Sequence, residues 1–141
     1  MQRGRRIAFD YGDVRIGVAA SDSDSILVVP ITTLSTSSKS LLKEISAIFD
    51  EISPIEIYVG KPINLSGLEG VASSKALGFA EDLKGITQVP IKLIDERMST
   101  ISASRSLREA GKDSKQSKSI IDMAAAVAIL EFAIAVEKGK L

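Results

Sequence analysis

The 141-residue sequence contains no cysteine and no histidine. The absence of cysteine excludes disulfides and thiol nucleophiles, and it agrees with a cytoplasmic protein. The absence of histidine excludes a Ser-His-Asp triad, and without either residue ordinary zinc sites are excluded too. Carboxylate, lysine, arginine, tyrosine and hydroxyl chemistry remains. Because oxygen ligands suit hard cations, a metal site in this chain is expected to hold Mg²⁺ or Mn²⁺.

Long apolar runs are also missing, and neither sign of charge is in excess. No segment approaches the roughly 20 apolar residues of a membrane span, and Asp10 interrupts the apolar stretch behind the basic N-terminus, so no secretory signal is predicted. We therefore expect a cytoplasmic protein that does not associate with membranes. The 18 basic and 18 acidic residues cancel, which argues against a strongly basic nucleic-acid coat but allows a local basic patch.

What is present is a regular alternation of apolar segments. The 45% apolar content is enough for the core of one domain over residues 1–141. Short connections between the first three strands favour an antiparallel meander, and the later strand-helix-strand spacing favours parallel neighbours. Ser37 or Ser38 is expected to cap the first helix. The expected strands are 6–10, 15–20, 26–29 (with Pro30 near its end), 55–59 and 91–95, and the expected helices are about 41–49, 72–83, 100–110 and 119–138.

Three acidic residues stand out against this pattern. Asp10 and Glu96 each follow an apolar strand, and sites in α/β sheets gather at the carboxyl ends of strands. Asp122 lies on an apolar helix face, where a carboxylate needs a cation or hydrogen bonds. Each acid also has an ordinary explanation, because Asp is common in turns and Ser119 with Asp122 has the spacing of a capping box. The spacing alone leaves both interpretations open.

The motifs resemble those of the bacterial YqgF family, also called RuvX. The segments DYGDVRIGVAASD (Asp10–Asp22), VGKPINLSGLEG (Val59–Gly70), DERMST (Asp95–Thr100) and IDMAAA (Ile121–Ala126) occur in the family's order over nearly the whole chain. The resemblance implies an RNase H-like fold, with a mixed five-stranded sheet of three antiparallel strands and then two parallel ones, flanked by helices.

The same resemblance implies a function. It implies that Asp10, Glu96 and Asp122 converge as catalytic metal ligands for Mg²⁺ or Mn²⁺ in a nuclease, a hydrolase acting on phosphodiester bonds. Two divalent ions about 3.5–4 Å apart can activate water and stabilise the leaving oxygen. Alternation along a strand puts Asp95 and Glu96 on opposite faces, and the motif favours Glu96. The implied process is 5′-end maturation of the pre-16S rRNA, or alternatively Holliday-junction cleavage in DNA recombination or repair.

Residues in or beside the motifs are candidates for contacting nucleic acid, either a structured RNA precursor or branched DNA. Cations there would position the phosphate backbone rather than identify bases. Monomer and homodimer both stay open, since symmetric junction cleavage needs a dimer and rRNA trimming does not. The candidate residues are Arg15, Asn64, Arg97, Lys115 and Lys118.

Two rival classes share features of this sequence. A sugar kinase or actin-like ATPase also opens with an Asp-x-Gly strand turn, but it needs two such domains around its nucleotide, and 141 residues supply one. A catalytically inactive nucleic-acid-binding module would keep the fold and lose the chemistry, which the presence of all three acids argues against.

Overall fold

A mixed five-stranded sheet forms the centre of the described structure. The computed structural model describes residues 1–62, 70–96 and 115–139, with the side chains of 115–119 left out. Strands β1 (Arg6–Tyr11), β2 (Arg15–Ser21) and β3 (Val28–Ser35) form an antiparallel meander. Strands β4 (Glu56–Lys61) and β5 (Ile91–Asp95) run parallel to β1, giving the order β3-β2-β1-β4-β5. This confirms the predicted pattern of three antiparallel strands followed by two parallel ones.

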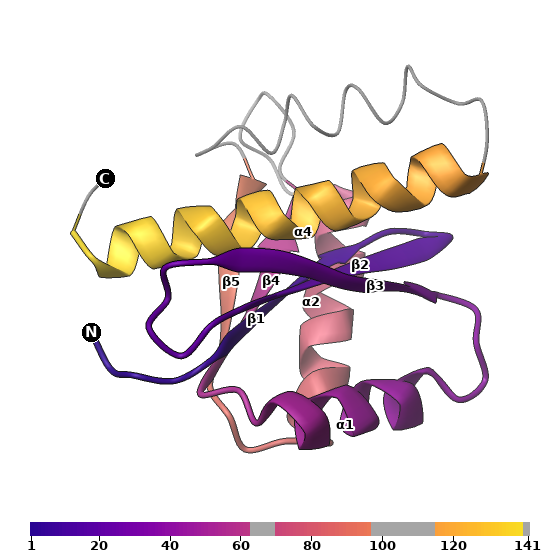
Figure 1. Cartoon of the computed structure of the whole chain (residues 1–141). Helices are drawn as coiled ribbons and strands as arrows, with labels where there is room; N and C mark the ends of the chain where they lie inside the picture. Colours follow the sequence, from indigo (N-terminus) through magenta and orange to yellow (C-terminus); the bar gives the residue numbers. More distant parts are fainter. Residues whose placement is uncertain (63–69, 97–114, 140–141) are drawn as a thin grey trace.

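Helices cover both faces of the sheet. Helices α1 (Leu41–Ile52) and α2 (Val71–Lys84) lie on one side, and α4 (Lys115–Glu137) crosses the other (Figure 1). Phe9 of β1 stacks edge-on with Phe49 of α1 and Phe79 of α2, at ring-centroid distances of 6.0 and 5.5 Å. These apolar contacts fix the first layer of the core.

The core beneath α4 combines alanines with larger apolar residues. Ala8 of β1 and Ala19 of β2 are fully buried against Ala126 and Leu130 of α4. Because side chains alternate along a strand, Ala8 and Asp10 face α4, while Ile7 and Phe9 face α1 and α2. Asp10 therefore lies on the α4 side of the sheet.

The third strand differs from its prediction. It was expected over 26–29 and to end near Pro30, but it runs from Val28 to Ser35 through that proline. Pro30 pairs with Ala19 next to a register shift at Val18/Ala19. The strand lies at the edge of the described sheet, where a residue without an N–H is tolerated.

Two helix starts also differ from expectation. Helix α1 follows Ser40, and neither Ser37 nor Ser38 is its N-cap; the hydroxyls of Ser38 and Ser40 donate instead to the Glu44 carboxylate, at 2.6 and 2.8 Å. Helix α4 begins at Lys115, four residues before the expected 119. The helix expected over 100–110 lies outside the described residues. Within the described chain, no helix has the length and apolarity needed to cross a membrane.

Candidate active site

Asp10 lies near the carboxyl end of β1 and is 1% exposed. Its partner in β2 is Gly17, and its neighbour on the other side is β4, which pairs with β1 up to Phe9 and Val59. The strand pattern turns the Asp10 side chain toward α4. A carboxylate so deeply buried needs compensation by hydrogen bonds or charge.

Two glycines beside Asp10 let α4 approach the sheet closely. A Cβ on Gly17 would overlap the backbone carbonyl of Asp122. A Cβ on Gly60 would lie 2.5 Å from Cδ1 of Ile129 in α4 and 3.2 Å from Oε1 of Glu96. Glycine within a strand commonly marks such an approach. No role was predicted for these two glycines from the sequence. Their positions within and directly after predicted strands could have indicated a close approach by another element.

Asp122 projects from the interior of α4 and not from its first turn. The helix begins at Lys115, seven residues earlier, so the capping-box explanation with Ser119 is wrong. Its side chain is 4% exposed, and its Oδ2 accepts a hydrogen bond from Nε of Arg15 at 2.8 Å. Asp122 is therefore a buried carboxylate beside the sheet, held in part by an arginine at the start of β2.

Glu96 follows directly after β5 and is 3% exposed, whereas its neighbour Asp95 is half-buried. Ile94, two residues before Glu96, packs in the apolar cluster beneath α4 and pairs with Gly60. Together with the Glu96 oxygen near Gly60, this places Glu96 on the α4 face. Asp10, Glu96 and Asp122 thus lie on one face of the sheet, at the end where β1, β4 and β5 finish.

The three acids lie on one face of the sheet, but a metal site also requires that their oxygens be close together. Within the ranges that the structure describes, no group of three or more acidic side chains has the spacing to hold a metal ion. The positive charge next to Asp122 belongs to Arg15.

The remaining predicted contacts are only partly described. Arg15 is half-buried at the start of β2. Asn64 and Arg97 lie outside the described residues. Lys115 and Lys118 belong to the first turns of α4, and their side chains are not described. Arg15 is therefore the one predicted nucleic-acid contact whose surroundings the described structure gives.

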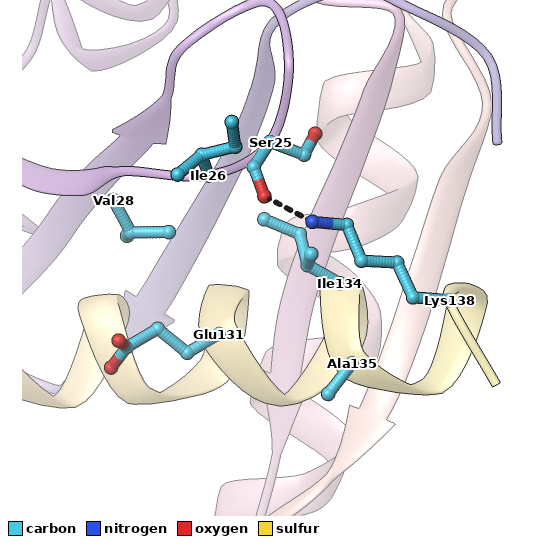
Figure 2. A pocket seen from close by; sticks show the side chains of 7 residues that line it. All are labelled: Ser25, Ile26, Val28, Glu131, Ile134, Ala135 and Lys138. Carbon is cyan, nitrogen blue, oxygen red and sulfur yellow. Dashed lines mark hydrogen bonds between the residues drawn. The ribbon is translucent and has the colours of Figure 1, made fainter. Parts of the chain in front are cut away.

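A pocket elsewhere on α4 does not include the three acids. It lies between the C-terminal half of α4 and the turn that joins β2 to β3 (Figure 2). Nζ of Lys138 donates to the carbonyl of Ser25 across it, at 2.8 Å. Its lining is Ser25, Ile26, Val28, Glu131, Ile134, Ala135 and Lys138.

The fold resembles that of RuvC from Thermus thermophilus. A RuvC structure in complex with a Holliday junction substrate superposes with a TM-score of 0.59 at 13% identity, covering 97% of each chain. A second Thermus thermophilus RuvC structure superposes with a TM-score of 0.56 at 16% identity, covering 96% of this chain and 97% of that one. Such low identities define the fold alone. The molecule has an RNase H-like fold.

Sequence similarity narrows this class. Residues 4–135 match the RuvX family, described as Holliday junction resolvase, and the chain belongs to that family. A Streptomyces coelicolor protein is 46% identical over 140 residues, 98% of this chain and 84% of its own. A protein from Mycobacteroides abscessus is 48% identical over 132 residues, which cover 92% of this chain and 80% of its own. Both bear the name "Putative pre-16S rRNA nuclease". The family resemblance found in the motifs is confirmed, and the enzyme class is that of nucleases.

Proposed function

We propose that this protein hydrolyses phosphodiester bonds with the help of Mg²⁺ or Mn²⁺ held by Asp10, Glu96 and Asp122, in 5′-end processing of pre-16S rRNA. The observation that carries the proposal is the burial of three acidic residues, each no more than 3% exposed as a whole residue, on one face of the sheet. They come from β1, from the end of β5 and from α4, so the chain gathers them from distant positions.

The donor set fits a hard divalent cation. All three side chains offer carboxylate oxygens, and the whole chain has no histidine or cysteine that would favour a softer metal. Carboxylates brought together at a buried site repel one another, so we infer that a bound cation would be needed to draw these three together. Gly17 and Gly60 support this fit by bringing α4, and Asp122 with it, down onto the strand that holds Asp10.

A divalent cation in such a site supplies an activated water and stabilises charge on the leaving oxygen. The chain's own contribution is to hold and orient the three carboxylates and to bind the substrate backbone. We propose Arg15, Asn64, Arg97, Lys115 and Lys118 for that second role, as contacts that fix the register of the nucleic acid without identifying its bases.

The choice of pre-16S rRNA over a junction rests on the curated relatives, which carry that name at 46% and 48% identity. Holliday-junction cleavage is the second candidate, because the family is described by that activity and the similar RuvC structure holds a Holliday junction substrate.

The test is Asp10→Asn, with Asp13→Asn as the matched control. Asp13 lies three residues later, in the turn between β1 and β2, where its side chain is 72% exposed and pairs with Lys75. We expect Asp10→Asn to lower Mn²⁺-dependent cleavage of a pre-16S rRNA fragment by roughly 100-fold or more, since a metal stabilises the transition state by several kcal/mol. Asp13→Asn should cleave normally.

Thermal melts supply a readout that does not depend on activity. Mn²⁺ at one hundred times its Kd should stabilise the wild type by about 2.7 kcal/mol and should no longer stabilise Asp10→Asn. Normal cleavage by folded Asp10→Asn would show that the site is wrongly assigned.

A further inference from the structure

Arg15 places a positive charge against Asp122, one of the three carboxylates that we propose as metal ligands. Nε of Arg15 lies 2.8 Å from Oδ2 of Asp122, and the two residues are 107 positions apart. The Asp122 side chain is 4% exposed and that of Arg15 is 24% exposed. The arginine therefore reaches from a solvent-accessible position to a buried carboxylate.

An arginine and a divalent cation compete for such an oxygen. Both carry positive charge, and two positive charges that approach the same buried carboxylate repel each other. A metal bound to Asp122 would therefore weaken the Arg15 contact, and Arg15 in turn should weaken metal binding. Competition of this kind is reciprocal, because each ligand changes the affinity of the other by the same factor.

Hydrogen bonds hold the backbone before Arg15, whereas its side chain is 24% exposed. The turn before it is tied to β3, since Oγ1 of Thr36 donates to the carbonyl of Gly12 at 2.7 Å. The backbone N–H of Thr36 donates to the carbonyl of Val14 at 3.0 Å. The guanidinium stands at the end of a long, partly exposed side chain. Its planar set of donors can pair with a phosphate as well as with a carboxylate.

We propose that Arg15 is a positioning residue that exchanges partners: it holds Asp122 while no metal is bound, and it binds a backbone phosphate once a divalent cation takes Asp122. This rests on the metal site proposed above. The exchange makes tight backbone binding conditional on the metal, so that substrate is held firmly only by protein that is ready to cleave it.

Calorimetric titration with Mn²⁺ alone tests whether Arg15 competes with the metal for Asp122. Arg15→Gln should bind Mn²⁺ about fivefold more tightly than wild type, or more, because the competing charge is gone. Arg15→Lys should be intermediate, since an ammonium pairs less well with a carboxylate than a guanidinium does. The matched control is Arg3→Gln, whose Nε also lies 2.8 Å from an aspartate oxygen, that of Asp24, in an exposed pair, and it should bind Mn²⁺ like wild type.

The salt dependence of binding to a fluorescein-labelled RNA hairpin tests whether Arg15 contacts a phosphate once the metal is bound. With Ca²⁺ present, Arg15→Gln should lower the slope of log K against log salt by about 0.7–0.9, the value for one phosphate contact. In EDTA its slope should equal that of wild type. Arg15→Lys should restore the slope with Ca²⁺, because its charge can still contact a phosphate.

The outcomes separate this proposal from the one it rests on. If the wild type takes up no Mn²⁺, the metal site is wrong and the exchange is overturned with it. If the wild type and Arg15→Gln bind Mn²⁺ equally, or the slope falls equally in Ca²⁺ and EDTA, only the exchange is overturned. Melting curves in EDTA check that each variant is folded, and Arg15→Lys carries the test if Arg15→Gln is not.

Discussion

At the scale of single residues, Gly17 controls how closely α4 lies on the sheet. Its Cα faces the backbone of Asp122, and a Cβ there would overlap the Asp122 carbonyl. A flexible side chain could move out of the way, but a helix backbone cannot do so without shifting the helix. The position of the Asp122 carboxylate relative to Asp10 therefore depends on an absent methyl group.

We predict that Gly17→Ala destabilises the protein by about 3 kcal/mol, the upper part of the range for overpacking a core. Metal binding should weaken as well, because α4 is displaced. The control is Gly78→Ala in α2, where an added Cβ meets nothing within 4 Å. That substitution should stabilise the helix by up to about 1 kcal/mol. Urea unfolding measures both effects, and equal stability of the two variants would contradict the role of Gly17.

At the scale of elements, α4 is anchored near its C-terminus by a buried charge network, in addition to its contact at Asp122. Arg6 of β1 is fully buried and lies 3.3 Å from Glu56 of β4 and 3.5 Å from Glu137 of α4. Nζ of Lys92 in β5 lies 2.9 Å from Glu56. The Tyr58 hydroxyl donates to both Glu56 and Glu137. Three strands and one helix are thus joined by opposite charges.

The network shifts the pKa of the Glu56 carboxyl. Burial alone would raise this pKa, but the hydrogen bonds and charges of the network, among them those of Lys92 and Tyr58, outweigh burial and lower the pKa from 4.5 to about 2. Burial and the nearby carboxylates raise the pKa of the Tyr58 hydroxyl, which therefore stays protonated as a donor. Since the folded state binds a proton at Glu56 less readily than the unfolded state, protonation favours unfolding.

We predict that the free energy of unfolding falls as the pH drops from about 4.5 to about 2, and that Glu56→Gln reduces this fall. At pH 7 Glu56→Gln should cost about 2 kcal/mol, because hydrogen bonds to a charged group are lost. Glu81→Gln is the control, since the Glu81 side chain is 70% exposed and pairs with Lys84 of its own helix. Urea titrations across this pH range measure the free energy of unfolding. If Glu56→Gln leaves its pH dependence unchanged, Glu56 is not responsible for the fall.

At the scale of the whole molecule, the charges of the basic and acidic residues balance. With 18 basic and 18 acidic residues, the chain has no overall field that attracts nucleic acid. We therefore propose that binding depends on local cations such as Arg15. Phosphate contacts and a metal site would serve RNA and branched DNA equally, so the distinction lies in substrate shape and in the number of subunits.

We predict that the protein, with Mn²⁺, shortens a pre-16S rRNA fragment at its 5′ end and does not resolve a synthetic four-way DNA junction. Cleavage of both substrates in parallel is the measurement, with sedimentation of the protein under the same conditions. Paired symmetric nicks in the junction made by a dimer would favour the resolvase alternative instead, because cutting two strands symmetrically requires two sites.

The sequence by itself determined the order and type of most elements. Apolar alternation placed β1, β2 and β5 nearly to the residue, and helical spacing located α1 and α2. These elements follow from local patterns because each must bury one face whatever its partners are. The motifs identified the family, and through it the candidate acids.

The tertiary structure decided what depends on contacts between distant residues. Pro30 continues a strand because β3 lies at the edge of the described sheet, and Gly17 and Gly60 matter because α4 crosses them. The early start of α4 removes Asp122 from the first turn, and Arg15 meets that carboxylate across 107 residues. No local pattern encodes these contacts, since they arise from how packed elements cross one another.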